Sequence, residues 1–219
     1  MRSESVPEGL SGVYSKLRGL KLIAFDLDGT IWTPGKLMNM NSKYHRLTDE
    51  EISLLSDLTH LIDMYQLWGG GSPFTYASNK KDLVDKSGHV VRLLGISGEI
   101  LDDVKSHPSL QPIKVVWVSC TDEPVWAKEC LEKFRTVPSG NPIGSAADGY
   151  EIFSANKQVH FKNLRAKYPS IDFSEMLFFD NEYGNIRSVS QLGVRCVHCP
   201  DGMNSPAWLE GLSLFVDDL

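Results

Sequence analysis

The chain has 219 residues, of which 42% are hydrophobic and 23% are charged, and these proportions are those of an ordinary soluble globular protein. Its formal net charge of −6 argues against binding to nucleic acid. No apolar run approaches the roughly 20 residues that cross a bilayer, and the segment from Met1 to Gly9 lacks the apolar stretch of a signal peptide. We therefore expect a cytoplasmic protein with no membrane partner.

The four cysteines are too few to build the disulfide scaffold of a small secreted domain. Cys196 and Cys199 form a C-x-x-C pattern, which could bind zinc or act in redox chemistry. We interpret them instead as part of an apolar strand, because no second pair of ligands lies nearby in the sequence.

Strand and helix patterns alternate along most of the chain. Apolar runs predict buried strands at residues 20–25, 113–118, 150–153, 176–179 and 194–199. Helical periodicity predicts helices at residues 97–105, 123–134, 157–168, 183–192 and 208–215. Such an alternation predicts an α/β fold, in which a Rossmann-like parallel sheet carries helices on both faces.

The segments outside this alternation are less regular. A short helix is expected near Tyr14, and the chain is expected to break at residues 32–35. A capping-box pattern at residues 48–51 predicts a helix within the segment 36–80. Residues 83–93 alternate around a Lys-Ser-Gly turn, which predicts a β-hairpin.

The segment Asp26-Leu27-Asp28-Gly29-Thr30 directly follows the first apolar strand. In an open α/β sheet, ligands bind outside the carboxyl ends of the strands. Two carboxylates two residues apart in an extended chain project to the same side, and their repulsion is costly unless a cation or a shared proton relieves it. A hard divalent ion such as Mg²⁺, which takes oxygen ligands, is the expected partner of Asp26 and Asp28.

Three further polar residues follow strands in the same way. Ser119 and Asp180 directly terminate apolar strands, and Lys157 lies just beyond another. If these strands are neighbours in a parallel sheet, the three side chains converge with Asp26 at one edge. Their chemistry suits phosphoryl transfer, because a carboxylate can attack phosphorus, a hydroxyl and the N–H groups of a helix start can hold phosphoryl oxygens, and a lysine can balance the charge of the transition state.

This ordered set of residues resembles the motifs of the haloacid-dehalogenase-like hydrolases, most of which are phosphatases. The resemblance implies that Asp26 is the nucleophile and forms an aspartyl-phosphate, and that Asp28 is the general acid and base. It also implies an Mg²⁺ cofactor and a phosphate site. The implied metal ligands are Asp26, Asp28, Asp180 and Asn181, and the implied phosphate-binding residues are Ser119, Cys120 and Lys157.

Within this superfamily, the chain is similar to the eukaryotic magnesium-dependent phosphatase group, also described as acid-phosphatase-like. The similarity runs over residues 20–34 and 83–215, and the stretch 173–182 is the most characteristic part of it. It implies a fold with a minimal cap, in which residues 83–93 are a small hairpin near the site. It also implies substrates of the phosphotyrosine or sugar-phosphate type.

Two features depart from this group. Residues 36–80 are longer than is usual, so we expect a single domain over residues 1–219 with an inserted segment that either extends a cap or decorates an edge. Asn181 stands where the group usually has a second aspartate. Related phosphatases that act on the polymerase C-terminal domain carry Asp-Asn at this point, so we expect weaker metal binding rather than lost activity.

Two assignments stay open between alternatives. Ser78 competes with Ser119 for the hydroxyl position, because a capped helix is expected before it and Ser-Asn is common there across the superfamily. Ser119 is preferred for its better strand and the helix that follows it. Glu182 either reaches the water shell of the metal or is ordinary acidic charge at a helix start.

The sequence thus predicts a monomeric, Mg²⁺-dependent phosphatase that acts on a phosphorylated protein or small molecule. The alternative is a phosphate-binding or scaffolding protein on the same fold, with catalysis weakened by Asn181. Because both Asp26 and Asp28 are present, the enzyme is the preferred hypothesis.

Overall fold

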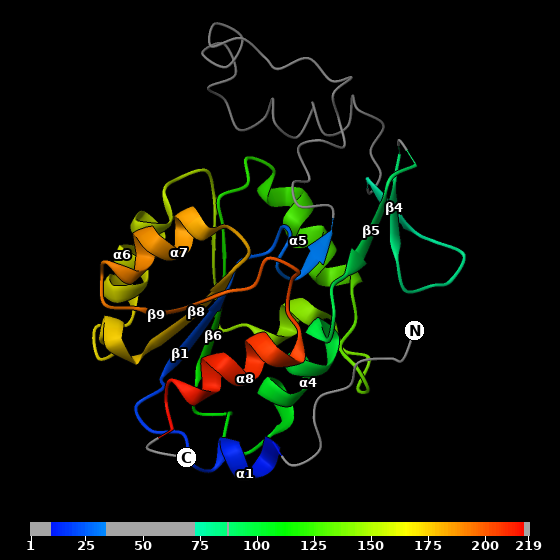
Figure 1. Ribbon diagram of the computed structural model, residues 1–219. Coiled ribbons are helices and arrows are strands. Elements are labelled where there is room, and N and C mark those ends of the chain that lie inside the picture. The colour runs from blue at the N-terminus through cyan, green and yellow to red at the C-terminus, as the bar shows by residue number, and fades with distance from the viewer. Residues whose placement is uncertain (1–9, 34–72, 87, 217–219) are drawn as a thin grey trace, which may run out of the picture.

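The computed structural model describes residues 10–33, 73–86 and 88–216 (Figure 1). Most of the expected insertion, including the helix predicted after Thr48, lies outside these residues. Within them, a five-stranded sheet forms the middle layer, helices cover both of its faces, and a separate four-stranded sheet lies to one side. The predicted α/β architecture is therefore confirmed.

The central sheet is parallel throughout. Its strands β1 (Leu22–Phe25), β6 (Lys114–Ser119), β7 (Gly149–Ile152), β8 (Met176–Asp180) and β9 (Arg195–His198) lie in the order β7-β6-β1-β8-β9. Every residue of β1 and β8 is buried, as expected for strands covered on both faces. Phe25 lies opposite Trp117 of β6 and Phe179 of β8, so the carboxyl ends of three strands meet.

Helices form a layer on each side of this sheet (Figure 1). The helices are α1 (Leu10–Tyr14), α4 (Ser97–Ser106), α5 (Pro124–Lys133), α6 (Lys157–Lys167), α7 (Tyr183–Ser190) and α8 (Ser205–Ser213), with the 3₁₀ helices η2 (Ile143–Ala146) and η3 (Phe173–Glu175). Side chains alternate along β1. Leu22 and Ala24 join the core beneath α6 and α7, whereas Ile23 and Phe25 join the core beneath α1, α4, α5 and α8.

The second sheet is antiparallel and consists of β2 (Trp32–Thr33), β3 (Phe74–Tyr76), β4 (Leu83–Asp85) and β5 (Val90–Leu93), in the order β2-β5-β4-β3. The hairpin predicted at residues 83–93 is confirmed as β4 and β5. The break predicted at residues 32–35 is wrong at its start, because Trp32 pairs with Leu93 of β5. Ser78 lies in an exposed turn between β3 and β4, away from the central sheet.

Smaller differences concern the ends of elements, where helix boundaries vary most. The helix expected at residues 183–192 ends at Ser190, and the loop expected at residues 136–149 contains η2. Gly193, which follows α7, has a φ of +94°, the left-handed conformation that commonly ends a helix.

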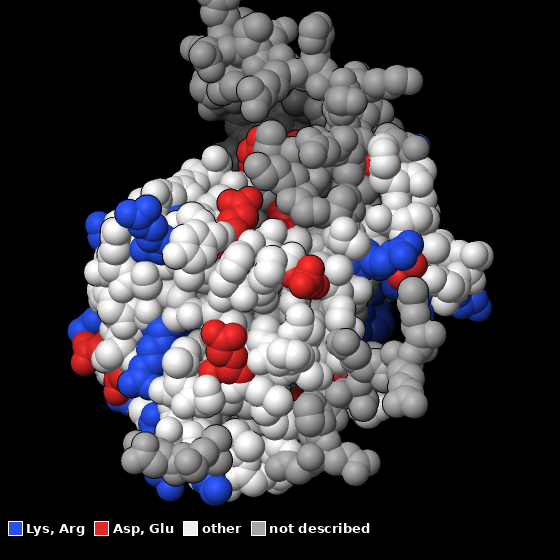
Figure 2. Space-filling model, in the orientation of Figure 1, with Lys and Arg blue, Asp and Glu red and all other residues white. Residues whose placement is uncertain are grey.

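The surface and the helices agree with the broad expectations from composition. None of the described helices is long and apolar enough to cross a membrane. On the face shown in Figure 2, the described lysines and arginines stand in separate groups between acidic and uncharged residues rather than in one continuous basic surface.

Candidate active site

Asp26 lies directly after β1, at the carboxyl end of the central sheet, and is 7% exposed. Its backbone N–H donates to the carbonyl of Phe179 on β8 at 3.0 Å, which extends the strand pairing by one residue. The chain then turns sharply, with the carbonyl of Leu27 accepting the N–H of Thr30 at 3.2 Å. Gly29 makes this turn possible, because its φ of +84° is a conformation that glycine adopts without steric cost.

Lys157 connects the ends of three strands. It is the first residue of α6, and its side chain is 1% exposed. The Nζ atom donates to Oδ1 of Asp26, donates to the carbonyl of Val118 on β6 at 2.6 Å, and lies 3.5 Å from Oδ2 of Asp180 on β8. The structure therefore brings together Asp26, Lys157 and Asp180, three of the residues selected from the sequence.

The charges of this cluster do not balance, because two buried carboxylates share one ammonium group. Burial raises the pKa of Asp180 to about 7, and the charge of Asp26 adds to this effect. Burial also acts to lower the pKa of Lys157, but the charges of Asp26 and Asp180 outweigh it and raise that pKa above its usual value. The excess of negative charge favours binding of a divalent cation.

Thr30 links the loop after β1 to the loop after β8. Its Oγ1 lies 3.3 Å from Oδ2 of Asp26 and 3.3 Å from Oδ1 of Asn181, and it accepts the backbone N–H of Asn181 at 3.0 Å. The Asn181 amide lies against Gly29, where a Cβ atom would be only 2.5 Å from Nδ2. Because Gly29 has no side chain, the Asn181 amide can pack directly against the loop that follows Asp26.

Asp28 is half-buried, and the indole of Trp32 is one of its partners. Its Oδ1 accepts a hydrogen bond from Nε1 of Trp32 at 2.9 Å. The Trp32 ring is fully buried and stacks on Phe134 with 6.0 Å between the ring centres. Asp28 thus accepts a hydrogen bond from a core side chain four residues further along the chain.

Ser119 ends β6, the strand beside β1, and is 1% exposed. Its hydroxyl oxygen accepts the backbone N–H of Thr121 at 3.2 Å, in the loop that leads into α5. The next residue, Cys120, is exposed, and its Sγ lies 3.9 Å from Nε2 of the buried His160. Burial and the positive charge of Lys157 lower the pKa of His160 to about 4, so its ring is uncharged at neutral pH.

The start of α7 holds the Asp180 carboxylate from the other side. The backbone N–H of Glu182 donates to Oδ1 at 2.7 Å, and Nδ2 of Asn185 donates to Oδ2 at 3.0 Å. Glu182 is the residue before the first turn of α7, and its Oε2 accepts from Asn185 at 3.4 Å. These contacts favour the helix-start interpretation of Glu182.

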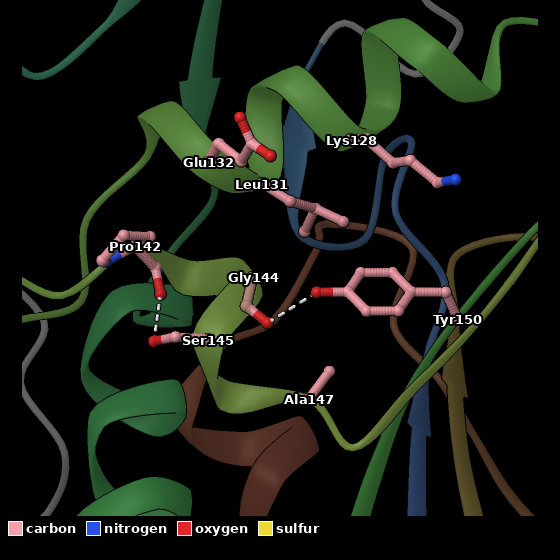
Figure 3. A pocket seen from close by; sticks show the side chains of 8 residues that line it. All are labelled: Lys128, Leu131, Glu132, Pro142, Gly144, Ser145, Ala147 and Tyr150. Atoms are coloured by element: carbon pink, nitrogen blue, oxygen red, sulfur yellow. Dashed lines mark hydrogen bonds between the residues drawn. The ribbon is translucent and has the colours of Figure 1, made fainter.

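A pocket of about 420 Å³ lies between α5, η2 and β7 (Figure 3). In it, the Tyr150 hydroxyl donates to the Gly144 carbonyl at 3.0 Å, and Lys128 and Glu132 project from α5. The lining residues are Lys128, Leu131, Glu132, Pro142, Gly144, Ser145, Ala147 and Tyr150. The residues selected from the sequence are not among them, so the candidate chemistry lies at the strand ends.

The donor atoms at the strand ends fit a magnesium ion. In the described part of the chain, no group of three or more His, Cys, Asp or Glu side chains is arranged to hold a metal. The site instead offers the carboxylates of Asp26 and Asp180 and the neutral amide oxygen of Asn181. Mg²⁺ usually binds through one or two carboxylates and keeps several waters, whereas zinc favours nitrogen and sulfur ligands.

Comparison with known proteins places this chain in a family. The model of a family described as acid phosphatase matches residues 18–218. The chain belongs to this family. The sequence-based prediction of a phosphatase of the haloacid-dehalogenase type is thereby confirmed.

Curated relatives agree with this assignment. Human magnesium-dependent phosphatase 1 is 28% identical over 195 residues, which are 89% of this chain and 86% of the human protein. A haloacid-dehalogenase-like hydrolase superfamily protein of Schizosaccharomyces pombe is 30% identical over 127 residues, which are 56% of this chain and 70% of that protein.

Solved structures share the fold. A haloacid-dehalogenase-family enzyme of Bacteroides thetaiotaomicron, solved as a magnesium complex, has a TM-score of 0.55 at 14% identity, covering 88% of this chain and 99% of that enzyme. The same enzyme with magnesium and inorganic phosphate has a TM-score of 0.51 at 14% identity, covering 84% of this chain and 96% of that enzyme. At such identities the likeness establishes the fold alone.

Sequence reasoning assigned no role to three residues that contact the site, namely Thr30, Trp32 and Asn185. Thr30 is the last residue of the motif that begins at Asp26, so its place near the site could have been inferred from the sequence. Trp32 and Asn185 lie four residues after Asp28 and five after Asp180. These offsets become contacts only through the turn and the helix start that follow each strand.

Proposed function

We propose that this protein hydrolyses phosphate monoesters through an aspartyl-phosphate on Asp26, with Mg²⁺ as its cofactor. The observation that carries the proposal is the shared buried ammonium: Nζ of Lys157 holds Oδ1 of Asp26 and lies 3.5 Å from Oδ2 of Asp180. Family membership supplies the reaction class, and the human relative is named a magnesium-dependent phosphatase.

In the first step, a carboxylate oxygen of Asp26 attacks phosphorus, and the bond between phosphorus and the leaving oxygen breaks. Asp28 gives its proton to that oxygen, so the product leaves as a neutral alcohol or phenol. Lys157 and the Ser119 hydroxyl, together with the N–H groups around Cys120, hold the phosphoryl oxygens and balance their charge.

In the second step, water attacks the phosphorus of the aspartyl-phosphate. Asp28, now a carboxylate, takes a proton from this water while the bond between phosphorus and Asp26 breaks. Inorganic phosphate leaves, and both aspartates return to their starting states. Lys157 stabilises the Asp26 carboxylate as it forms again.

The ligands that this chain would offer Mg²⁺ are the Asp26 and Asp180 carboxylates and the Asn181 amide oxygen. Bound there, the cation supplies neutralisation of the charge on the transferred phosphoryl group. Asp28, which the sequence also named as a ligand, is proposed for proton transfer, and its Oδ1 accepts the Trp32 indole N–H.

We further propose a cytoplasmic monomer of one domain that acts on a phosphoprotein, phosphotyrosine included, or on a small sugar phosphate. All four cysteines of the chain are free, which fits a reducing compartment. The separated basic groups of Figure 2 and the net charge of −6 are consistent with a substrate other than nucleic acid.

The test is hydrolysis of an aryl phosphate with and without Mg²⁺ by the wild type, Asp26→Asn and Asp122→Asn. Asp122 is exposed in the loop after β6 and serves as the matched control. We expect Mg²⁺-dependent turnover that falls by roughly 10³-fold or more in Asp26→Asn and stays near wild type in Asp122→Asn. Acid-quenched wild type should carry one phosphoryl group by mass spectrometry, and Asp26→Asn should carry none.

A second candidate, the phosphate-binding protein, rests on Asn181, a neutral ligand in place of a carboxylate. It would bind Mg²⁺ and inorganic phosphate by calorimetry yet release no phosphate from any ester. If Asn181→Asp both tightens Mg²⁺ binding and produces turnover, a weakened metal site accounts for the lack of turnover in the wild type.

A further inference from the structure

We propose that His160 is a positioning residue for the phosphate-binding loop, because its Nε2 holds the side chain of Cys120, the residue that follows Ser119. The inference rests on the proposed function, in which the Ser119 hydroxyl and the N–H groups around Cys120 hold the phosphoryl oxygens. It assigns a role in phosphate binding to a buried side chain that takes no part in the proposed proton or phosphoryl transfer.

The loop that follows β6 is held at its start, at its end and in the middle. The N–H of Phe153 donates to the Ser119 carbonyl at 3.1 Å, and the N–H of Thr121 donates to the Ser119 hydroxyl oxygen at 3.2 Å. Between these contacts, Sγ of Cys120 lies 3.9 Å from Nε2 of His160. The middle of the loop is therefore connected to α6, the helix that carries His160.

The imidazole ring of His160 is fixed in place. It has no exposed surface, and it lies against the ring of Phe153 with 4.1 Å between the ring centres. His160 follows Lys157 by three residues on α6, so the two side chains are neighbours on one face of the helix. Nζ of Lys157 holds Asp26 and the Val118 carbonyl. One helix thus carries both the cation of the site and the contact to the loop.

The side chain of Cys120 lies close to the charges of the candidate site. Burial raises the pKa of its thiol, the positive charge of Lys157 acts to lower that pKa, and the carboxylates of Asp26 and Asp180 raise it further. Such electrostatic effects weaken with distance. A displacement of Cys120 would therefore move the loop relative to the groups that are proposed to bind phosphate.

A neutral imidazole suits this position. Burial and the positive charge of Lys157 lower the pKa of His160 to about 4, so the ring is uncharged at neutral pH. A neutral imidazole has one N–H and one acceptor nitrogen, so Nε2 can pair with the thiol in either tautomer, as a donor to sulfur or as an acceptor of S–H. A second cation in its place would repel Lys157. The ring therefore holds the loop without adding charge beside the site.

Packing alone does not explain a histidine at position 160. Among the described residues, its Nδ1 has no hydrogen-bond partner, and burial of an unsatisfied polar atom costs free energy. A phenylalanine would pack against Phe153 in the same way without this cost. What histidine adds over phenylalanine is the contact of Nε2 with Cys120.

The experiment is a double-mutant cycle of His160→Phe, Cys120→Ala and the variant with both changes. Phenylalanine keeps an aromatic ring beside Phe153 and removes Nε2, whereas alanine at position 120 removes Sγ and keeps the backbone N–H. Calorimetry measures the Kd of inorganic phosphate in the presence of Mg²⁺ for each protein, and thermal unfolding measures its Tm. The two measurements separate a loss of phosphate binding from a loss of packing.

The matched control is a second histidine that contacts both a hydroxyl and an aromatic ring. Nε2 of His107 lies 3.0 Å from Oγ of Ser11, and its ring lies edge-on to Tyr14 with 4.9 Å between the ring centres. His107→Phe and Ser11→Ala therefore form the same kind of cycle at the end of α4. His160→Gln serves as the conservative variant, because its amide nitrogen can take the place of Nε2.

In His160→Phe we expect inorganic phosphate to bind roughly two- to tenfold more weakly, as for the loss of one hydrogen bond. Cys120→Ala should weaken binding by a similar factor, and His160→Phe should have little further effect in that background, because the contact is already lost. His160→Gln should recover part of the affinity. The control cycle should leave the Kd of phosphate at its wild-type value.

A wild-type Kd in His160→Phe would overturn the inference and leave His160 a packing residue. An equal loss with and without Cys120→Ala would also overturn it, because the effect would then not pass through the thiol. If His160→Phe does not fold, Cys120→Ala removes the same contact from the other side, and a wild-type Kd there overturns the inference. A wild type that binds no phosphate overturns it as well, whereas one that binds phosphate but forms no phosphoenzyme refutes only the proposed function.

Discussion

The two sheets of this protein carry ion pairs of the same chemistry in opposite surroundings. At the edge of the central sheet, Lys157 pairs with Asp26 and Asp180, and the three side chains are 1%, 9% and 0% exposed. At the antiparallel sheet, Nε of Arg92 on β5 lies 3.8 Å from Oδ2 of Asp82, and the two side chains are 56% and 23% exposed. Exposed pairs contribute little to stability, whereas buried charges are costly to hold. A gain in stability alone therefore does not explain the buried cluster.

The largest difference between the two regions should appear when each loses its cation. Lys157→Met leaves two buried carboxylates without their shared partner, and we expect the free energy of unfolding to fall by roughly 3–5 kcal/mol. The control Arg92→Met should cost about 1 kcal/mol or less. Urea unfolding at neutral pH without Mg²⁺ measures both variants.

Turnover should also fall more in Lys157→Met than in Arg92→Met. Lys157→Met should lose at least about 10²-fold in turnover, the magnitude typical for removal of one charge-stabilising donor, while Arg92→Met should retain wild-type turnover. Equal losses of stability in the two variants would contradict the view that burial distinguishes the Lys157 ion pairs from the exposed Arg92 pair.

The two sheets also differ in how well the sequence predicts them. The central strands are buried on both faces, so β1 and β8 appear as continuous apolar runs and were placed to within two residues. Strands β2 and β3 have only two and three residues, and the Pro34-Gly35 pair that follows Trp32 and Thr33 in the sequence is why Trp32 was taken as the start of a break. Half-exposed short strands gain their stability from cross-strand neighbours that the local sequence does not reveal.

The residues of the candidate site also differ in how well the sequence predicts them. Ser119 and Asp180 could be selected because each is a polar residue at the end of an apolar run, and parallel strands bring such ends together. Trp32, which binds Asp28, and Asn185, which binds Asp180, could not be selected, because they reach the site only through local turns. The buried state of Lys157 also could not be predicted, because a lysine at a helix start is ordinarily solvated.

The second expected effect concerns pH and arises only in the buried region. The pKa of Asp180 is about 7 in the folded protein and about 3.9 in an unfolded chain. Between these values the folded state binds more protons, so the stability of the metal-free protein should fall as pH rises from 4 to 7, by about 1 kcal/mol per pH unit. Urea unfolding across this range should show the slope in the wild type and lose it in Asp180→Asn, while Asp82→Asn keeps it.

Mg²⁺ binding should show the opposite dependence on pH. A cation that Asp180 ligates requires the carboxylate, so affinity should drop as pH falls below 7, approaching tenfold per pH unit. Calorimetric titration of Mg²⁺ at several pH values measures this directly. A flat affinity between pH 5 and 7 would argue that Asp180 is not a ligand.

The smallest effect compares two glycines with the same backbone conformation, one in each region. Gly29 in the site loop has a φ of +84°, and Gly88 in the hairpin between β4 and β5 has a φ of +86°. Alanine at either position is strained by about 1–2 kcal/mol. At Gly88 the new methyl group meets nothing within 4 Å, whereas at Gly29 it lies 2.5 Å from the Asn181 amide.

Because the backbone strain is shared, a further difference between Gly29→Ala and Gly88→Ala reports on the site loop, where the new methyl group meets Asn181. We expect both variants to lose similar stability, and only Gly29→Ala to bind Mg²⁺ several-fold more weakly, since its methyl group displaces the neutral oxygen ligand. Equal Mg²⁺ affinity in the two variants would mean that Asn181 does not ligate the cation. The metal would then rest on Asp26 and Asp180 with water, and the asparagine would serve only to join the two loops through Thr30.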